Sequence, residues 1–157
     1  METSHATQHL LLELDFKYGK QLLTALLPMG LTVVWHSVGI NVVHRVFRRF
    51  GRPILHGPHR VARTAVVTTV VAVLLITHFL EVALWAAFYS VSGLVDDVGK
   101  AMYFSINAYT TMGEGGVLLP DKWRGFGNFE SMTGFLMFGW STAVLADIVQ
   151  RMHSVED

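Results

Sequence analysis

The chain of 157 residues contains no cysteine and few charged side chains. The absence of cysteine excludes a disulfide scaffold, a thiol nucleophile and a metal site with cysteine ligands. Charged residues make up only 15% of the chain, whereas an average soluble domain has about 25%. The formal net charge is zero, which excludes a nucleic-acid-binding protein and argues against a disordered chain. A soluble protein with an unusually large core or a small membrane protein remains.

Three long segments lack Asp, Glu, Lys and Arg altogether: 21–40, 65–80 and 131–146. A membrane-spanning helix requires about 20 predominantly apolar residues. Buried helices of a soluble bundle are the alternative, but such helices carry a polar stripe, and segment 65–80 has only threonines and His78 as polar residues. The sequence therefore predicts three transmembrane helices, over 21–44, 64–91 and 129–150.

Segment 1–20 precedes the first of these helices. It is not a secretory signal, because it has no basic leader before an apolar core and carries Glu13 and Asp15. Its leucines are consistent with an amphipathic segment at the membrane surface. A loose N-terminal tail is the alternative, and the sequence leaves both interpretations open.

Six of the eight arginines lie in segment 45–63, which contains no acidic residue. Basic loops of membrane proteins face the cytoplasm, so we expect a cytoplasmic loop here and an extracytoplasmic segment after residue 91. We also expect this loop to contact anionic membrane lipids. The arginines concerned are Arg45, Arg48, Arg49, Arg52, Arg60 and Arg63.

The segment between the second and third predicted spans begins with a short apolar stretch, 101–111. As a helix it would reach about 16 Å, roughly half the thickness of a bilayer. A glycine cluster at 112–116 and the polar residues Asp121 and Lys122 follow. Non-helical backbone at membrane depth is tolerated only inside protein or along a water-filled path. The pattern therefore predicts a re-entrant loop that lines an aqueous pore.

This part of the chain resembles the pore-loop cation channels of the potassium-channel superfamily. Thr110–Gly115 reads TTMGEG and is similar to the pore signature TTVGYG, and Tyr103–Phe104 matches the paired aromatics of the pore helix. Phe138–Thr142 and His78–Glu81 resemble the inner and outer helices of small bacterial two-helix channels. The resemblance covers 64–151.

The resemblance implies an all-α membrane protein, with three transmembrane helices and a re-entrant loop around a tetrameric pore. Helix 21–44 would pack on the outside, against lipid. The protein would be a homotetramer in a bacterial inner membrane, conducting monovalent cations passively, with no enzymatic activity and no cofactor beyond the permeant ions. The implied pore domain, 64–151, comprises an outer helix at 64–91, a pore helix at 100–111, a filter at 111–116 and an inner helix at 129–150.

The resemblance also assigns roles to single residues. Backbone carbonyls of the filter replace the hydration shell of the ion, so cations would contact Thr111, Met112, Gly113 and Glu114. Asn107 and Glu81 would support the filter from behind. The full implied filter is Thr110, Thr111, Met112, Gly113, Glu114 and Gly115. The residues implied to line the cavity below it are Ser141, Thr142 and Leu145.

Glu114 replaces the tyrosine of the potassium-channel signature. A glutamate at this place is similar to the filter of cyclic-nucleotide-gated channels, which implies weak selectivity between potassium and sodium. A ring of four carboxylates would also bind divalent ions such as calcium. Alternatively, Glu114 turns away from the axis and braces the filter near Asn107 or Tyr109, which would preserve potassium selectivity.

Other interpretations stay open at this point. His36, His44, His78 and Glu81 could form the metal site of a membrane enzyme, and a non-conducting regulatory protein could retain the pore-loop fold. Glu81 is more simply expected to hydrogen-bond a neighbouring helix or the pore helix.

Three residues of the third predicted span have structural interpretations of their own. Asp147 is expected to pair with Arg151, one helical turn further on; the alternative is that it lines the cytoplasmic mouth of the pore and raises the local cation concentration. Gly134 and Gly139 are expected to permit close helix packing, with a hinge as the alternative.

Overall fold

The computed structural model describes residues 2–54, 60–113 and 116–153, with side chains from residue 19 to residue 152 inside these ranges. Its long helices are α1 (Glu2–Val46), α2 (Arg60–Val91) and α4 (Phe126–His153), and a short helix, α3 (Val98–Tyr109), lies between the last two. Helix α1 continues into a π-helical turn, Phe47–Gly51, and a 3₁₀ turn, Arg52–Ile54. A further 3₁₀ turn, Asp121–Trp123, precedes α4. No strand occurs in these described ranges.

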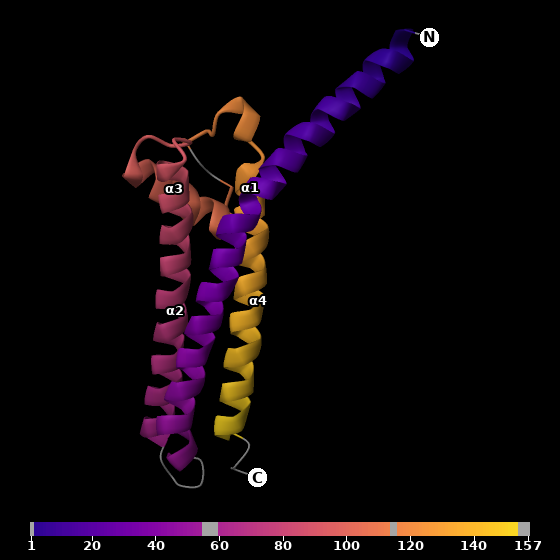
Figure 1. Ribbon diagram of the computed structural model, residues 1–157. Helices are drawn as coiled ribbons and strands as arrows, with labels where there is room; N and C mark the ends of the chain where they lie inside the picture. The colour runs from indigo at the N-terminus through magenta and orange to yellow at the C-terminus, as the bar shows by residue number, and fades with distance from the viewer. Residues whose placement is uncertain (1, 55–59, 114–115, 154–157) are drawn as a thin grey trace.

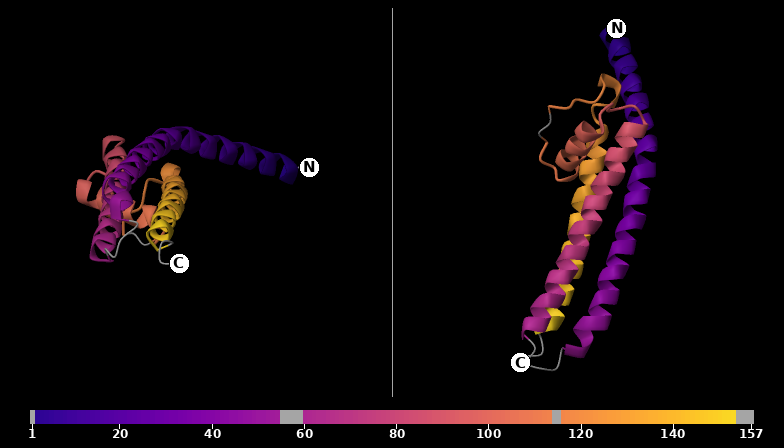
Figure 2. Two further views of the ribbon diagram at one scale, coloured as in Figure 1. Left: turned by 90° about the horizontal axis from the view of Figure 1, so that it is seen from below. Right: turned by 90° about the vertical axis from the view of Figure 1, so that its left-hand side faces the viewer.

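Helices α1, α2 and α4 run side by side as a three-helix bundle, and α3 lies at one end of it (Figure 1). The N-terminal part of α1 extends past this end and away from the other helices (Figures 1 and 2). Helix α4 ends at the opposite end of the bundle, where α1 ends and α2 begins. The short helix and the segment after it are therefore grouped at one end, and the arginine-rich segments at the other.

Three helical segments are long and apolar enough to cross a membrane: Gly19–Ile54, Arg60–Val91 and Asp121–Met152. Each contains one of the three predicted spans. The prediction of three membrane-spanning helices is therefore confirmed in the length and apolar composition of the helices. Large apolar side chains lie on the outside of the bundle, as at Leu23 and Phe135, each 71% exposed. Apolar surfaces of this extent are typical of helices that contact lipid or other subunits.

The helix ends differ from the predicted ones on the N-terminal side. Helix α1 begins at Glu2, so residues 2–18 are helical and continuous with the first span, which starts at Gly19. Segment 1–20 contains no proline and only one glycine, Gly19, so no residue in it terminates a helix. The predicted loop 45–63 is helical up to Ile54, because arginine has a high helix propensity. Pro53 lies in the final 3₁₀ turn.

Helix α3 begins at Val98, two residues before the predicted start. The Asp97 side chain caps it by accepting a hydrogen bond from the Lys100 backbone N–H at 2.8 Å, a common stabilising feature of helix starts. Helix α4 also begins early, at Phe126. The ring of Phe126 is fully buried and stacks on Phe88 of α2 at 5.5 Å, which holds the start of α4 against α2.

Two apolar clusters hold the bundle together. The cluster nearer to α3 joins all four helices, with Ala25 contributed by α1, and its largest side chains are Trp85, Tyr89, Tyr109 and Phe126. The cluster at the opposite end joins α1, α2 and α4 through Val43, Val70, Leu74, Ile148 and Met152. A layer of buried polar residues lies beside the first cluster, and the candidate site is found there.

Candidate functional site

The chain turns sharply directly after α3. The backbone N–H groups of Thr111 and Met112 donate to the carbonyls of Ala108 and Asn107, both at 3.0 Å. Thr111 and Gly113 have positive φ angles of 60° and 72°. Positive φ is uncommon for a non-glycine residue, so this turn adopts a conformation that most side chains would disfavour.

Four of the six predicted filter residues occupy this turn. Thr110, Thr111, Met112 and Gly113 are all exposed on the surface of the single chain. Glu114 and Gly115 lie outside the described residues, so the two interpretations of Glu114 both stay predictions.

Asn107 is buried at the end of α3, immediately before the turn. Its side-chain amide donates to the Tyr103 carbonyl at 2.7 Å, and its own carbonyl accepts from Met112. The side chain therefore bonds within α3, while the backbone carbonyl closes the turn that follows.

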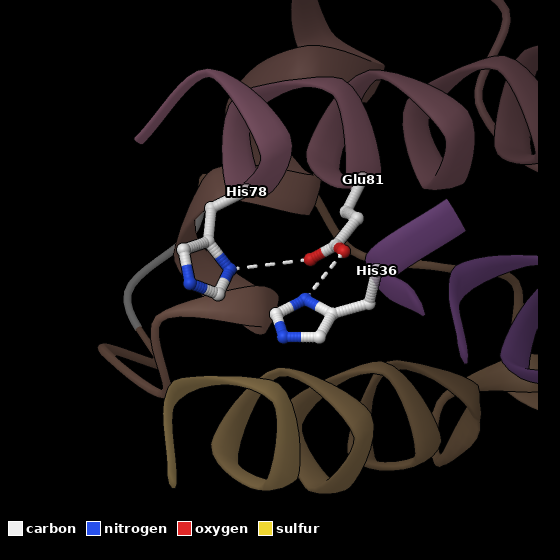
Figure 3. A group of neighbouring side chains, drawn as sticks. All are labelled: His36, His78 and Glu81. Carbon is white, nitrogen blue, oxygen red and sulfur yellow. Dashed lines mark hydrogen bonds and ion pairs between the residues drawn. The ribbon is translucent and has the colours of Figure 1, made fainter. Parts of the chain in front are cut away.

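A cluster of three ionisable residues lies behind α3, and we refer to His36, His78 and Glu81 as the His–Glu cluster. His36 belongs to α1, whereas His78 and Glu81 belong to α2. The His36 Nδ1 atom lies 2.9 Å from one Glu81 carboxylate oxygen, and the His78 Nδ1 atom lies 3.2 Å from the other. Figure 3 shows both imidazole rings directed at the carboxylate.

Two hydroxyl groups complete this cluster. The Tyr109 hydroxyl, at the end of α3, donates a hydrogen bond to Glu81 and lies 3.1 Å from His78 Nδ1. The Ser141 hydroxyl of α4 lies 3.0 Å from His78 Nε2 and 3.4 Å from His36 Nε2. All four helices therefore contribute a side chain to one connected polar network.

Glu81 is fully buried, with an exposed fraction of 0%. A buried carboxylate is costly unless other groups pair with it and hydrogen-bond to it. Both of its oxygens have partners here, supplied by His36 and His78 and by Tyr109. Glu81 thus connects α2 both to α1 and to the end of α3 from which the turn departs.

The structure corrects the expected position of Ser141. Its side chain is 6% exposed and faces the histidines of α1 and α2, so it is not available to line a cavity on the outer face of α4. Thr142, the next residue, is exposed, and Leu145 is half-buried against the apolar cluster at the far end of the bundle. The sequence could not show this orientation, because it depends on where α1 packs.

A second buried acid, Glu130, lies at the start of α4 and is not among the site residues predicted from the sequence. The Tyr89 hydroxyl donates to one of its oxygens at 2.7 Å, and the Ser105 hydroxyl lies 2.5 Å from the other. Ser105 also lies 2.8 Å from the Val82 carbonyl of α2. The available signal was that Glu130 directly precedes the charge-free segment 131–146.

Helices α3 and α4 approach closely at a glycine. A Cβ atom on Gly134 would collide with the backbone carbonyl of Tyr109, whereas a Cβ on Gly139 would meet nothing within 4 Å. The Ser131 hydroxyl also donates to the Ala108 carbonyl at 2.6 Å. The packing interpretation is therefore confirmed for Gly134, while Gly139 has no close neighbour among the described residues of the same chain.

The opposite end of the bundle is basic. The Arg151 guanidinium donates to both carboxylate oxygens of Asp147, at 2.9 and 3.0 Å, which confirms the predicted pair. A groove beside this pair is lined by His44, Arg48 and Arg52. Arginine side chains from the turns that follow α1 and from α4 thus meet at one end of the molecule.

Comparison with known proteins identifies the family of this chain. Residues 65–151, more than half of the chain, match a protein-family model described as "Ion channel". The matched region contains most of α2, all of α3, the turn after it and nearly all of α4. No curated protein and no solved structure matches the chain. With its three apolar helices, this chain is a multi-pass membrane protein that belongs to the ion channel family.

Proposed function

We propose that four copies of the chain form a pore that conducts monovalent cations passively, through the loop that follows α3. The observation that carries this proposal is the ion-channel match over 65–151, within which a short helix and a glycine-containing turn lie between two membrane-spanning helices. A pore loop requires this order of elements. The resemblance of residues 110–115 to a potassium-channel filter indicates that ions would pass along this turn.

The dimensions of α3 support a re-entrant pore helix. Its 12 residues correspond to about 18 Å, whereas the hydrocarbon core of a bilayer is about 30 Å thick. We infer that the helix enters the membrane region and ends inside it at Tyr109, where the turn begins. The negative end of its helix dipole lies at that turn and favours a nearby cation.

The exposed surface of α4 supports assembly around an axis. Met132, Phe135 and Leu136 are each more than half exposed on the single chain. Apolar surfaces of this kind in a channel subunit are suited to contact other subunits. Thr142 lies on the exposed side of α4 as well, so we retain Thr142 as a residue that lines the cavity below the filter, with Leu145 beside it.

We further propose that the filter discriminates weakly between potassium and sodium. The exposed Thr111, Met112 and Gly113 would present carbonyls to the ion, and the Glu114 carboxylates would form an outer ring that also accepts calcium. No tyrosine stands at position 114 to brace the strand. The alternative remains a potassium-selective filter with Glu114 as the brace.

The arginine-rich end supports a contact with anionic lipid headgroups on the cytoplasmic side. Arg48, Arg52 and Arg151 line one groove there, and Arg60 and Arg63 line another. This placement would orient the turn after α3 toward the opposite side of the membrane.

Replacement of a glycine inside the turn, compared with one outside it, tests whether the turn conducts. In Gly113→Ala the new side chain must adopt a positive φ of 72°, which costs roughly 1–2 kcal/mol per subunit. We expect the current through purified protein in a planar bilayer to fall by about tenfold or more. Gly93→Ala is the matched control, because Gly93 also has a positive φ, of 65°, and nothing within 4 Å of an added Cβ, but lies outside the proposed filter. Equal currents from both variants would contradict conduction through this turn.

A further inference from the structure

The His–Glu cluster has donor atoms at the spacing of metal ligands. Its three residues each offer one nitrogen or oxygen, and these atoms lie within 4.8 Å of one another. The two nitrogen–oxygen distances to Glu81 are 2.9 and 3.2 Å. Ligands bound to zinc at about 2.0–2.1 Å in a tetrahedron are about 3.3 Å apart, so little movement would be needed to place an ion between them.

The chemistry of the donors fits the same ion. Two imidazole nitrogens and one carboxylate are a common ligand set for Zn²⁺, whereas calcium and magnesium prefer oxygen ligands. All three side chains are buried, so bulk water does not compete for the ligand positions. This distinguishes the cluster from the exposed acidic groups that come together by chance on protein surfaces.

The Tyr109 hydroxyl offers a fourth ligand. It lies 3.1 Å from His78 Nδ1 and hydrogen-bonds to Glu81, so it is adjacent to two of the three donors. Tetrahedral zinc takes four ligands. With Tyr109 included, the ligands come from α1, α2 and α3.

The hydrogen bonds of Ser141 provide an independent argument. Both Nδ1 atoms face carboxylate oxygens, so without a metal each would carry a hydrogen, and in a neutral ring Nε2 would then be an acceptor. Ser141 lies near both Nε2 atoms but has one hydrogen to donate, which leaves one Nε2 without a donor. The unsatisfied Nε2 atom would gain a hydrogen of its own either if that histidine were a charged imidazolium or if a metal ion occupied its Nδ1 atom.

With a metal on both Nδ1 atoms, each Nε2 carries a hydrogen. Both can then donate to Ser141, whose oxygen has two lone pairs. Metal-bound histidines usually donate their second ring N–H to an acceptor of this kind, which fixes their orientation. The observed position of Ser141 between the two rings therefore matches the outer shell of a histidine metal site.

We propose that His36, His78 and Glu81, with Tyr109 beside them, bind one zinc ion per chain that fastens α1 to α2 and α3. His36 lies outside the family-matched residues 65–151. The site therefore requires a ligand from α1, a helix that the family model does not cover. The proposal does not depend on conduction through the turn after α3, and its test requires no current.

Zinc binding to the purified full-length protein tests this proposal. After removal of metal with a chelator, we expect equilibrium dialysis against zinc chloride to give one ion per chain. His36→Asn removes a ligand and should weaken binding by more than about 100-fold, because even outer-shell changes cost about 10–100-fold. His44→Asn is the matched control, since His44 is exposed on the same helix, and it should bind as the unchanged protein does.

A second variant and a spectrum keep the test decisive if His36→Asn folds poorly. Ser141→Ala retains every ligand and should weaken binding by about 10–100-fold. Cobalt bound in place of zinc should give the visible absorption bands of a tetrahedral site, which Ser141→Ala should shift and His44→Asn should leave unchanged. Absence of zinc binding, or equal binding by all variants, would overturn the proposal and favour an imidazolium at one of the histidines.

Discussion

At the residue scale, two buried glutamates determine how the short helix is held. Glu81 bonds to Tyr109, and Glu130 bonds to Ser105, so both acids reach α3 from neighbouring helices. An ionisable side chain inside a membrane-spanning bundle is expensive and is usually retained for a function. Here the two acids fix both the middle and the end of α3, and therefore the start of the turn.

Glu114→Gln tests the proposed carboxylate ring. In the proposed tetramer, the substitution removes four negative charges at one level of the pore. Since divalent ions bind best to several charged oxygens, we expect block of the potassium current by external calcium to weaken by about tenfold or more, as each 1.4 kcal/mol lost gives a factor of ten.

Asp96→Asn is the control for this substitution. Asp96 is exposed in the segment that joins α2 to α3, so the variant removes the same charge without altering the proposed filter. Calcium block should stay unchanged in Asp96→Asn. Equal block in Glu114→Gln and the unchanged protein would contradict the ring and favour Glu114 as a brace.

Individual residues were predictable where the partner is local in sequence. The Asp147–Arg151 pair follows from the spacing of four residues along one helix. Ser141 was misplaced because its partners, His36 and His78, belong to other helices. The burial of Glu130 was missed for the same reason, since Tyr89 and Ser105 contact it from α2 and α3.

At the element scale, the sequence predicts which segments are helices better than where they end. The three spans were recognisable because each contains a long charge-free segment, whereas helices of soluble proteins carry a polar face. The ends depend on particular contacts, such as the Asp97 cap of α3 and the buried ring of Phe126. The extension of α1 to Glu2 was not predicted. The polar residues of segment 1–20 interrupt the apolar pattern of the span, although the segment contains no residue that terminates a helix.

Gly134→Ala tests the contact between α3 and α4. The added methyl group would collide with the Tyr109 carbonyl and force the two helices apart. Overpacking of this kind costs about 1–3 kcal/mol of folding free energy. We therefore expect a lower Tm when unfolding in detergent is monitored by circular dichroism. Gly139→Ala is the matched control on the same helix, since its Cβ has open space within the chain. Similar losses of Tm in both variants would contradict the specific contact at Gly134.

At the scale of the whole molecule, the proposal requires several copies of the chain. The proposed filter residues Thr110–Gly113 are exposed at one end of the bundle, and large apolar side chains lie uncovered on α4. A cyclic assembly would bring four turns together around one axis. The fold of one chain followed from its sequence pattern, but the number of subunits came only from the family resemblance.

Native mass spectrometry of the purified protein tests this assembly. We expect a species with four times the 17.5 kDa mass of the chain. Replacement of the exposed Phe135 by Ser should reduce the tetramer fraction, because it removes apolar surface from α4 that is exposed in the single chain. A protein that stays monomeric or dimeric under all mild detergent conditions would contradict the proposed pore.

The most direct test of cation conduction is the reversal potential across a planar bilayer that contains the purified protein. Potassium is placed on one side and sodium on the other, at equal concentrations. We predict a measurable current that reverses near zero, because a filter with glutamate at position 114 should hardly distinguish the two ions. A reversal potential far from zero, with the sign that opposes potassium flow, would contradict weak selectivity, and the absence of current from a stable tetramer would contradict conduction itself.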